Sequence, residues 1–321
     1  MLARIRAFSN ASLLFHRARL LSTMPSSDSP PTKVANTIPA ALFQGDELWE
    51  SSWTEEPGEV TLKKRMQVDD PTLILYSSWF CPFAQRAWIA AEETGVNYKW
   101  VEINPYHVKP DQAGGYSKKS LSLEGKRAKY PGFVDTSPRG LVPAIAHGGK
   151  VLWESLPVAE YLDASFGGGK LVNRDDPYDV AHQQIWCAHC TDRVQKKFYQ
   201  ALVAQDEETQ KSATEQFHEE CRALARAMKD DGPYFNGKEF SLVDVALAPF
   251  WQRIVTVGPH YFGLTLPSDE PEFQRLETWW QEVKTRPSIA NTIVCGPRLI
   301  ASYQDYFQGV ATSDAARNYI K

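Results

Sequence analysis

A single cysteine beside a predicted helix start is the residue of this sequence best placed to do chemistry. In the stretch SSWFCPFAQRAW, Cys81 follows a short apolar run that predicts a strand, and Pro82 opens a predicted helix over residues 82–95. The first-turn amides and the helix dipole favour negative charge at that position. We therefore predict that the pKa of Cys81 lies below ~7.5, under the ~8.5 of a free thiol, despite desolvation by neighbouring aromatic rings. The alternative is a buried cysteine that acts as a small apolar residue.

The site is predicted to contain one thiol. A dithiol oxidoreductase would carry a second cysteine three residues after Cys81, and that position is Ala84. A disulfide formed at Cys81 must then be resolved by an external thiol, for which glutathione is the obvious candidate.

A second cysteine pair, Cys187 and Cys190, has C-x-x-C spacing on a predicted helix with His182 and His189 nearby. Zinc would need a further pair of ligands at good geometry, and none is evident. We interpret these cysteines as helix packing and predict no metal site.

The elements around Cys81 predict a thioredoxin-like domain. A strand over 98–104 completes a β-α-β unit, and residues 142–154 predict a hairpin. A helix over 155–169 follows, with Ser155 as its predicted N-cap. The polar segment 105–141 receives no assignment.

The second half of the chain is predicted to be helical. Asp176-Pro177 marks a helix start, and Ser241 with Asp244 has the spacing of a capping box. The predicted fold is therefore an α+β thioredoxin-like domain at residues 69–169, followed by an all-helical domain at residues 176–321.

Composition limits the classes of function. The chain has 321 residues, a net charge of −4 and five cysteines. The charge argues against a nucleic-acid partner, and no uncharged apolar stretch reaches the ~20 residues that cross a bilayer. A sparse, odd set of cysteines fits a reducing compartment.

The first 40 residues differ from the rest. They are rich in arginine and serine and contain no acid before Asp28, which is typical of a mitochondrial transit peptide. The alternative is a disordered tail, with Met24 as a second start that gives a cytoplasmic form. Residues 41–68 are interpreted as an extension on the surface of the fold.

From about residue 70 to residue 290 the chain resembles the omega class of cytosolic glutathione transferases. The resemblance rests on CPFAQRAW, INPYHVKP, SPRGLVPAI, LWESLPVAEYLD and SLVDVALAPF. It implies that Val142 precedes a cis-Pro143 and pairs through its backbone with glutathione. It also implies that Glu154 and Ser155 bind the γ-glutamyl end, while Phe83 packs beside the glutathione sulfur.

The resemblance also implies a lysine for the glycyl carboxylate of glutathione. Lys109 is the preferred candidate. The alternative is Lys129, which has a suitable spacing from Pro143 and lies within an apparent insertion at residues 111–133. The acceptor-substrate pocket of this class borders the first helix of the helical domain. On that basis the predicted acceptor residues are Trp186, His189 and Arg193.

The resemblance implies a glutathione-dependent thiol transferase, in which Cys81 forms a mixed disulfide with glutathione. Deglutathionylation and dehydroascorbate reduction are the implied activities, and a homodimer is the implied assembly. One alternative is a glutathionyl-hydroquinone reductase, although that class carries tryptophan after Cys-Pro where this chain has Phe83. The other is a non-catalytic ligand-binding regulator, for which an activated thiol would have no purpose.

Overall fold

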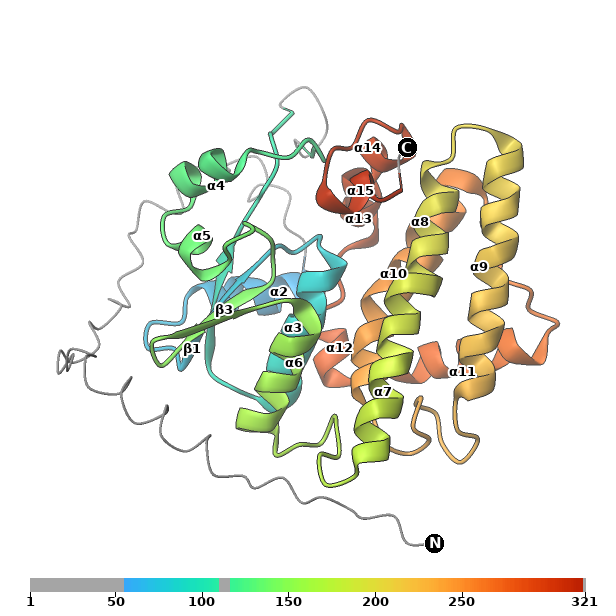
Figure 1. The fold of residues 1–321 in the computed structure, drawn as a ribbon, viewed down its shortest axis with the longest axis horizontal. Coiled ribbons are helices and arrows are strands. Elements are labelled where there is room, and N and C mark those ends of the chain that lie inside the picture. Colours follow the sequence, from blue (N-terminus) through green and yellow to red (C-terminus); the bar gives the residue numbers. More distant parts are fainter. Residues whose placement is uncertain (1–54, 110–115, 320–321) are drawn as a thin grey trace, which may run out of the picture. The chain divides into compact units, whose positions relative to one another are not determined.

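The computed structural model describes residues 55–109 and 116–319, and a four-stranded sheet forms the centre of its N-terminal part (Figure 1). The strand order is β2-β1-β3-β4, with β1 and β2 parallel and the other two pairs antiparallel. This is the β-α-β and β-β-α order predicted for a thioredoxin-like domain. The strands are β1 (Leu73–Ser77), β2 (Tyr98–Glu102), β3 (Ala144–His147) and β4 (Lys150–Trp153).

Two helices that pack against each other accompany the sheet, α3 (Pro82–Thr94) and α6 (Ser155–Leu162). Helix α3 begins at the proline that follows Cys81 and ends at Gly95, whose φ of 69° is the left-handed cap that glycine adopts without cost. Helix α6 continues into a π-helical turn at Asp163–Gly167. The predicted cap of α6 was one residue off, because the N-cap is Glu154, at a φ of 74°, and Ser155 is the first helical residue.

The C-terminal part is helical, as predicted. The side chain of Asp176 caps α7, and Ser241 with Asp244 forms the complete capping box of α10. The helices are α7 (Pro177–His189), a π-helical segment (Cys190–Gln195), α8 (Lys196–Val203), α9 (Glu207–Ala227), α10 (Leu242–Phe262), α11 (Pro271–Val283), α12 (Pro287–Ala290), α13 (Gly296–Ser302), α14 (Gln304–Phe307) and α15 (Asp314–Arg317).

Buried polar side chains join α3 to α10. The Arg86 guanidinium donates to the Ala246 carbonyl at 2.9 Å, and Arg253 donates to Gln85 at 2.6 Å and to the Phe80 carbonyl at 3.1 Å. Because a buried donor is costly unless it is paired, these bonds fix the start of α3 against the helical domain. The position of Cys81 is thereby set from both halves of the chain.

The extension at residues 41–68 does not simply lie on the surface, as the sequence suggested. Its described part contains helix α2 (Pro57–Met66), with Leu62 only 2% exposed. A Cβ on Gly58 would come within 2.0 Å of the Ile293 carbonyl oxygen, so only glycine fits there. The Glu59 carboxylate also forms a buried ion pair with Arg298.

The structure describes residues 116–133 of the apparent insertion. This part includes α4 (Leu123–Lys129), and a further short helix, α5 (Phe133–Thr136), follows it. A β-bridge pairs Ser120 with Tyr106 just after β2. The insertion therefore returns to the end of the sheet where Cys81 lies.

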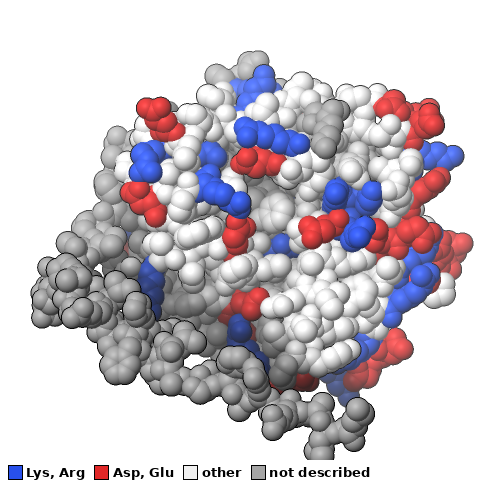
Figure 2. Space-filling model, viewed as in Figure 1, with Lys and Arg blue, Asp and Glu red and all other residues white. Residues whose placement is uncertain are grey.

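Lys and Arg are interspersed with Asp and Glu on the face in Figure 2, and neither sign gathers into a large patch. No helix within residues 55–109 and 116–319 is long and apolar enough to cross a membrane. The proposed transit peptide at residues 1–40 lies outside the described residues.

Candidate active site

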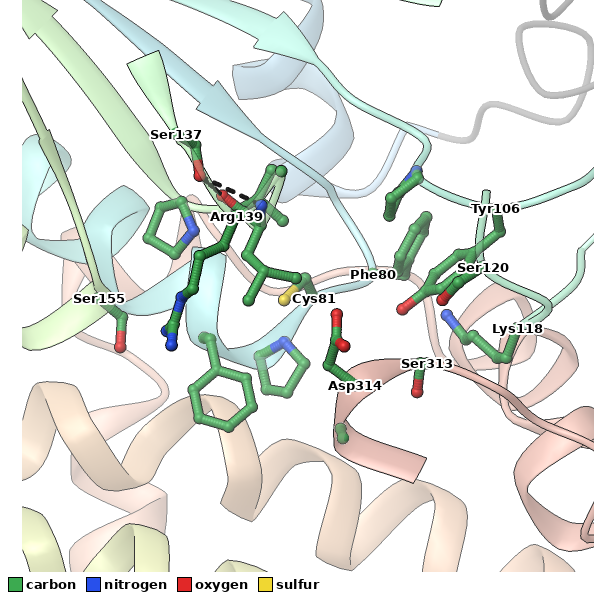
Figure 3. A pocket seen from close by; sticks show the side chains of 18 of the residues that line it. Phe80, Cys81, Tyr106, Lys118, Ser120, Ser137, Arg139, Ser155, Ser313 and Asp314 are labelled. Carbon is green, nitrogen blue, oxygen red and sulfur yellow. Dashed lines mark hydrogen bonds between the residues drawn. The ribbon is translucent and has the colours of Figure 1, made fainter. Parts of the chain in front are cut away.

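Cys81 lies on the wall of a cavity of about 450 Å³ formed by the sheet domain, the insertion and the C-terminal segment. Figure 3 shows Ser137, Arg139 and Ser155 on one side of its sulfur, and Tyr106 and Lys118 on the other. Cys81 is the N-cap residue of α3, as predicted, and is partly exposed. The cavity thus places the thiol between two groups of side chains.

The pKa of Cys81 does not follow the prediction. Burial raises the pKa of the thiol, and this effect exceeds the opposing ones. The amides of Ala84 and Phe83 and the positive charges of Arg253 and Lys118 lower the pKa, although the sulfur makes no capping hydrogen bond. The prediction failed because it counted only neighbours in sequence, whereas the insertion and the C-terminal segment also enclose the thiol.

Most residues that the sequence assigned to glutathione line this same cavity: Phe83, Val142, Pro143, Glu154 and Ser155. The Val142-Pro143 peptide bond is cis, as predicted. The Ser155 side chain is buried at the start of α6, and Arg86 lies 3.5 Å from its Oγ.

Glu154 has a partner that the sequence did not suggest. Its carboxylate forms an ion pair with Arg139, and both side chains are exposed at the cavity rim. Screened ion pairs of this kind contribute little to stability, so a ligand ammonium could compete with Arg139 for the carboxylate.

Neither lysine predicted for the glycyl carboxylate reaches the cavity. The Lys109 ammonium pairs with Asp305 Oδ1 at 2.5 Å, and the Lys129 ammonium lies 5.2 Å from the Tyr130 ring centroid. Lys118 and Lys126, both from the insertion, line the cavity instead. The Lys126 ammonium donates to the Gly140 carbonyl at 3.0 Å, close to the predicted glutathione edge at Val142.

The predicted acceptor residues are also elsewhere. Trp186 donates to His182 at 3.1 Å and contacts the Phe235 ring, His189 contacts the Glu220 carbonyl at 3.0 Å, and Arg193 is exposed. The far side of the cavity is instead rich in tyrosine. Its lining there includes Tyr106, Tyr199, Tyr303, Tyr306 and Tyr319.

The tyrosine hydroxyls bond to one another and to nearby side chains. Tyr199 and Tyr303 share a bond of 2.6 Å, and Arg253 donates to the Tyr303 hydroxyl at 3.2 Å. Tyr306 meets Ser313 at 2.6 Å. Burial raises the pKa of all three phenols, so they stay protonated and offer an uncharged aromatic wall with polar tips.

Sequence reasoning missed this wall because three of its tyrosines follow residue 290, beyond the motifs of the resemblance. The clustering of tyrosines in 303–319 was the signal available in the sequence. Tyr303 and Tyr319 have hydrogen-bond partners 104 and 124 positions away, Tyr199 and Gln195.

The other four cysteines are buried. Burial raises the pKa of Cys190 to about 12 and the pKa values of Cys187 and Cys221 well above the ordinary value. Cys187 and Cys190 lie in the main hydrophobic core, which is the packing role predicted for them. Among the described residues no group of three or more His, Cys, Asp or Glu side chains could hold a metal ion.

The comparisons with known proteins agree with the fold. The glutathione S-transferase N-terminal domain model matches residues 80–165, and the C-terminal domain model matches residues 189–281. Glutathione S-transferase L3 of Arabidopsis thaliana is 30% identical over 74% of this chain and 89% of its own length. The chain belongs to the glutathione S-transferase family.

Solved structures are similar as well. Glutathione transferase Omega 3C from Trametes versicolor is 30% identical, with a TM-score of 0.61 over 74% of this chain and 96% of that one. A rice glutathione transferase in complex with glutathione has a TM-score of 0.57 at 22% identity, covering 72% of this chain and 96% of its own, and so supports the fold alone.

Proposed function

We propose that this protein is a thiol transferase of the omega type, which uses Cys81 to carry glutathione as a mixed disulfide. One observation carries the proposal: a partly exposed cysteine at a helix start lines the same cavity as cis-Pro143, Glu154 and Ser155. A hydroxyl at this position could hydrogen-bond a glutathione thiolate but could form no disulfide with it, whereas a cysteine can. The similarity to an omega-class structure supports this choice.

The proposed reaction has two thiol-disulfide exchanges. The Cys81 thiolate attacks the glutathione sulfur of a mixed disulfide, so that a Cys81–glutathione bond forms and the substrate leaves as a thiolate that takes a proton. The thiolate of a second glutathione then attacks the same glutathione sulfur, releases glutathione disulfide and restores the Cys81 thiolate. When dehydroascorbate is the substrate, two glutathiones supply the two electrons and two protons that reduce it to ascorbate, and they leave as glutathione disulfide.

The cavity offers a place for each end of glutathione. A γ-glutamyl ammonium would meet the Glu154 carboxylate, and its carboxylate would meet Ser155 and the amides at the start of α6. Lys126 replaces Lys109 as the candidate for the glycyl carboxylate, because its ammonium lines the cavity and lies near Gly140.

Substitution of Cys81 tests the proposal. Cys81→Ser should lose glutathione-dependent reduction of dehydroascorbate and of a small disulfide, since serine forms no disulfide. The matched control is Cys295→Ser, because Cys295 is also an N-cap residue before a proline-containing helix start, that of α13, but lies outside the cavity. Full reductase activity in Cys81→Ser would refute the proposal.

A second candidate is the glutathionyl-hydroquinone reductase reaction, favoured by the tyrosine wall opposite Cys81. There Cys81 would attack the sulfur of a glutathionyl-hydroquinone, the ring carbon would take a proton, and a second glutathione would release glutathione disulfide. Phe83 stands where that class has tryptophan. Turnover of glutathionyl-hydroquinone faster than turnover of dehydroascorbate would favour this candidate.

A non-catalytic ligand-binding role is the third candidate, and an inert Cys81 would favour it. We also propose a homodimer, for which exposed apolar side chains such as Trp153 on β4 and Ile185 on α7 are available. Sedimentation of Ile185→Asp against the unchanged protein tests the dimer. Mitochondrial import by residues 1–40 remains part of the proposal.

A further inference from the structure

Lys118 is a buried lysine on the cavity wall that the mechanism above does not use. Its side chain is among the buried charged groups, with the residue 3% exposed. The ammonium lies 3.7 Å from the Phe80 ring centroid, 5.0 Å from that of Tyr106 and 5.9 Å from that of Tyr303. Aromatic faces attract a cation but carry no net negative charge. The charge of Lys118 is therefore not neutralised by the rings around it.

The backbone of Lys118 is fixed by the C-terminal segment. Its amide donates to Asp305 Oδ2 at 2.7 Å, and its carbonyl accepts from the Thr312 amide at 2.9 Å. Asp305 Oδ1 is taken by Lys109 at 2.5 Å. Both carboxylate oxygens of Asp305 thus have other partners, and Asp305 positions Lys118 through the backbone.

The other cations of the cavity are engaged. Lys126 donates to the Gly140 carbonyl, and Arg139 pairs with Glu154. Arg253, which does not line the cavity, donates to Gln85, to Tyr303 and to two backbone carbonyls. Among the described hydrogen bonds and ion pairs none is made by the Lys118 ammonium. Asp305 acts on this cation through its charge alone, and Lys118 lines the cavity.

Cys81 is the ionisable group that can supply the missing negative charge. Burial lowers the pKa of Lys118 to about 7, and the pKa of Cys81 is raised by burial, but each group opposes the other's shift. Each charge is costly to bury alone. When both are buried together, their mutual attraction offsets part of that cost. The other charged or titratable groups around this pair are Arg86, Arg253, Asp305, Asp314, Tyr106, Tyr303 and Tyr306.

We propose that Lys118, supplied by the insertion, is the positioning residue that stabilises the Cys81 thiolate and so sets the pH at which Cys81 reacts. The inference rests on the proposed function, in which that thiolate is the nucleophile. From the sequence, only the start of α3 was expected to stabilise the thiolate. The inference gives this role also to a lysine some 37 positions further along the chain. Arg253 adds a second positive charge, but its nitrogens are occupied in holding α3.

Alkylation of Cys81 by iodoacetamide, measured against pH without glutathione, tests this inference separately from the transfer reaction. The reagent is neutral, so its approach is not altered by the lysine charge. The variants are Lys118→Met, Lys118→Gln and Lys118→Arg, with Lys119→Met as matched control, because the Lys119 side chain is exposed on the same segment. Peptide mapping restricts the readout to Cys81, and near-ultraviolet circular dichroism checks the fold.

Lys118→Met should move the alkylation midpoint up by about one pH unit and leave the plateau rate at high pH unchanged. Lys118→Gln should do the same, Lys118→Arg should keep a midpoint near that of the unchanged protein, and Lys119→Met should have no effect. Natively folded Met or Gln variants with an unshifted midpoint overturn the inference. An unshifted midpoint with a raised KM for an anionic acceptor overturns it as well and makes Lys118 an acceptor-binding residue. A failed transfer reaction with a shifted midpoint would contradict the proposed function only.

Discussion

Asp244 offers the most direct test of how the helical domain holds the site. Its side chain is fully buried and accepts four hydrogen bonds. Oδ1 accepts from the Phe235 amide at 2.9 Å and from Trp279 Nε1 at 2.7 Å, while Oδ2 accepts from the amide and hydroxyl of Ser241, each at 2.8 Å. These bonds fix the start of α10. The same helix contains Arg253, which contacts the start of α3.

Asp244→Asn keeps the shape of the side chain but replaces one acceptor oxygen with a donor. The Ser241 hydroxyl can rotate to accept, whereas a backbone amide cannot, so one buried amide loses its partner and the remaining bonds lose their charge. An orphaned buried donor costs about 1–3 kcal/mol, and charged acceptors form bonds roughly twice as strong as neutral ones. Asparagine is neutral, so the substitution also removes the cost of burying a charge, which is the reason that burial raises the pKa of Asp244. This gain offsets part of the lost stability. We expect the free energy of unfolding to fall by about 3 kcal/mol.

Urea denaturation followed by tryptophan fluorescence measures this change. Asp206→Asn is the matched control: Asp206 caps α9 by accepting from the Thr209 amide, but at the surface, where asparagine caps as well. It should leave the urea midpoint unchanged. An Asp244→Asn protein as stable as the unchanged one would refute the reasoning that this carboxylate anchors α10.

Three further predictions concern the site and the leader. While Cys81 is a neutral thiol, Lys118 holds fewer protons in the folded than in the unfolded chain between pH about 7 and 10.5, and the charge of a Cys81 thiolate raises the pKa of Lys118 again. Stability should therefore rise with pH as the window opens near pH 7; Lys118→Met should flatten the pH profile of unfolding there, and an unchanged slope would contradict this. Glu154→Gln should weaken glutathione binding in calorimetry by about tenfold while Cys81 alkylation without glutathione stays unchanged, since the side chain acts on the far end of the ligand; equal loss of both would indicate a disturbed fold. Residues 1–40 fused to a fluorescent protein should enter mitochondria and be cleaved, whereas a diffuse, intact fusion would contradict the transit peptide.

The local part of the fold could be predicted from the sequence because its signals are local. Pro82 and Gly95 bracket α3, and Ser241 with Asp244 marks α10, since caps act over only a few residues. The β-α-β and hairpin units follow from short apolar runs and from glycines. The resemblance added cis-Pro143, which no spacing rule alone would have supplied.

The electrostatics of the site could not be predicted in this way, because they depend on contacts distant in sequence. Lys109 pairs with Asp305, 196 residues away, and so is withdrawn from the cavity. Lys118 occupies the cavity because residues 305 and 312 bind its backbone. The pKa of Cys81 depends on how these segments enclose it, and local sequence carries no measure of that enclosure.

The measurement that tests the central claim most directly is the location of glutathione on the protein after reaction with glutathione disulfide. The reaction would be stopped at low pH and analysed by intact mass and peptide mapping, for the unchanged protein and for Cys81→Ser. We expect one glutathione on Cys81, none on Cys81→Ser, and release of the adduct by reduced glutathione at a rate at least equal to turnover. An adduct on another cysteine, or reductase activity without an adduct on Cys81, would contradict the account.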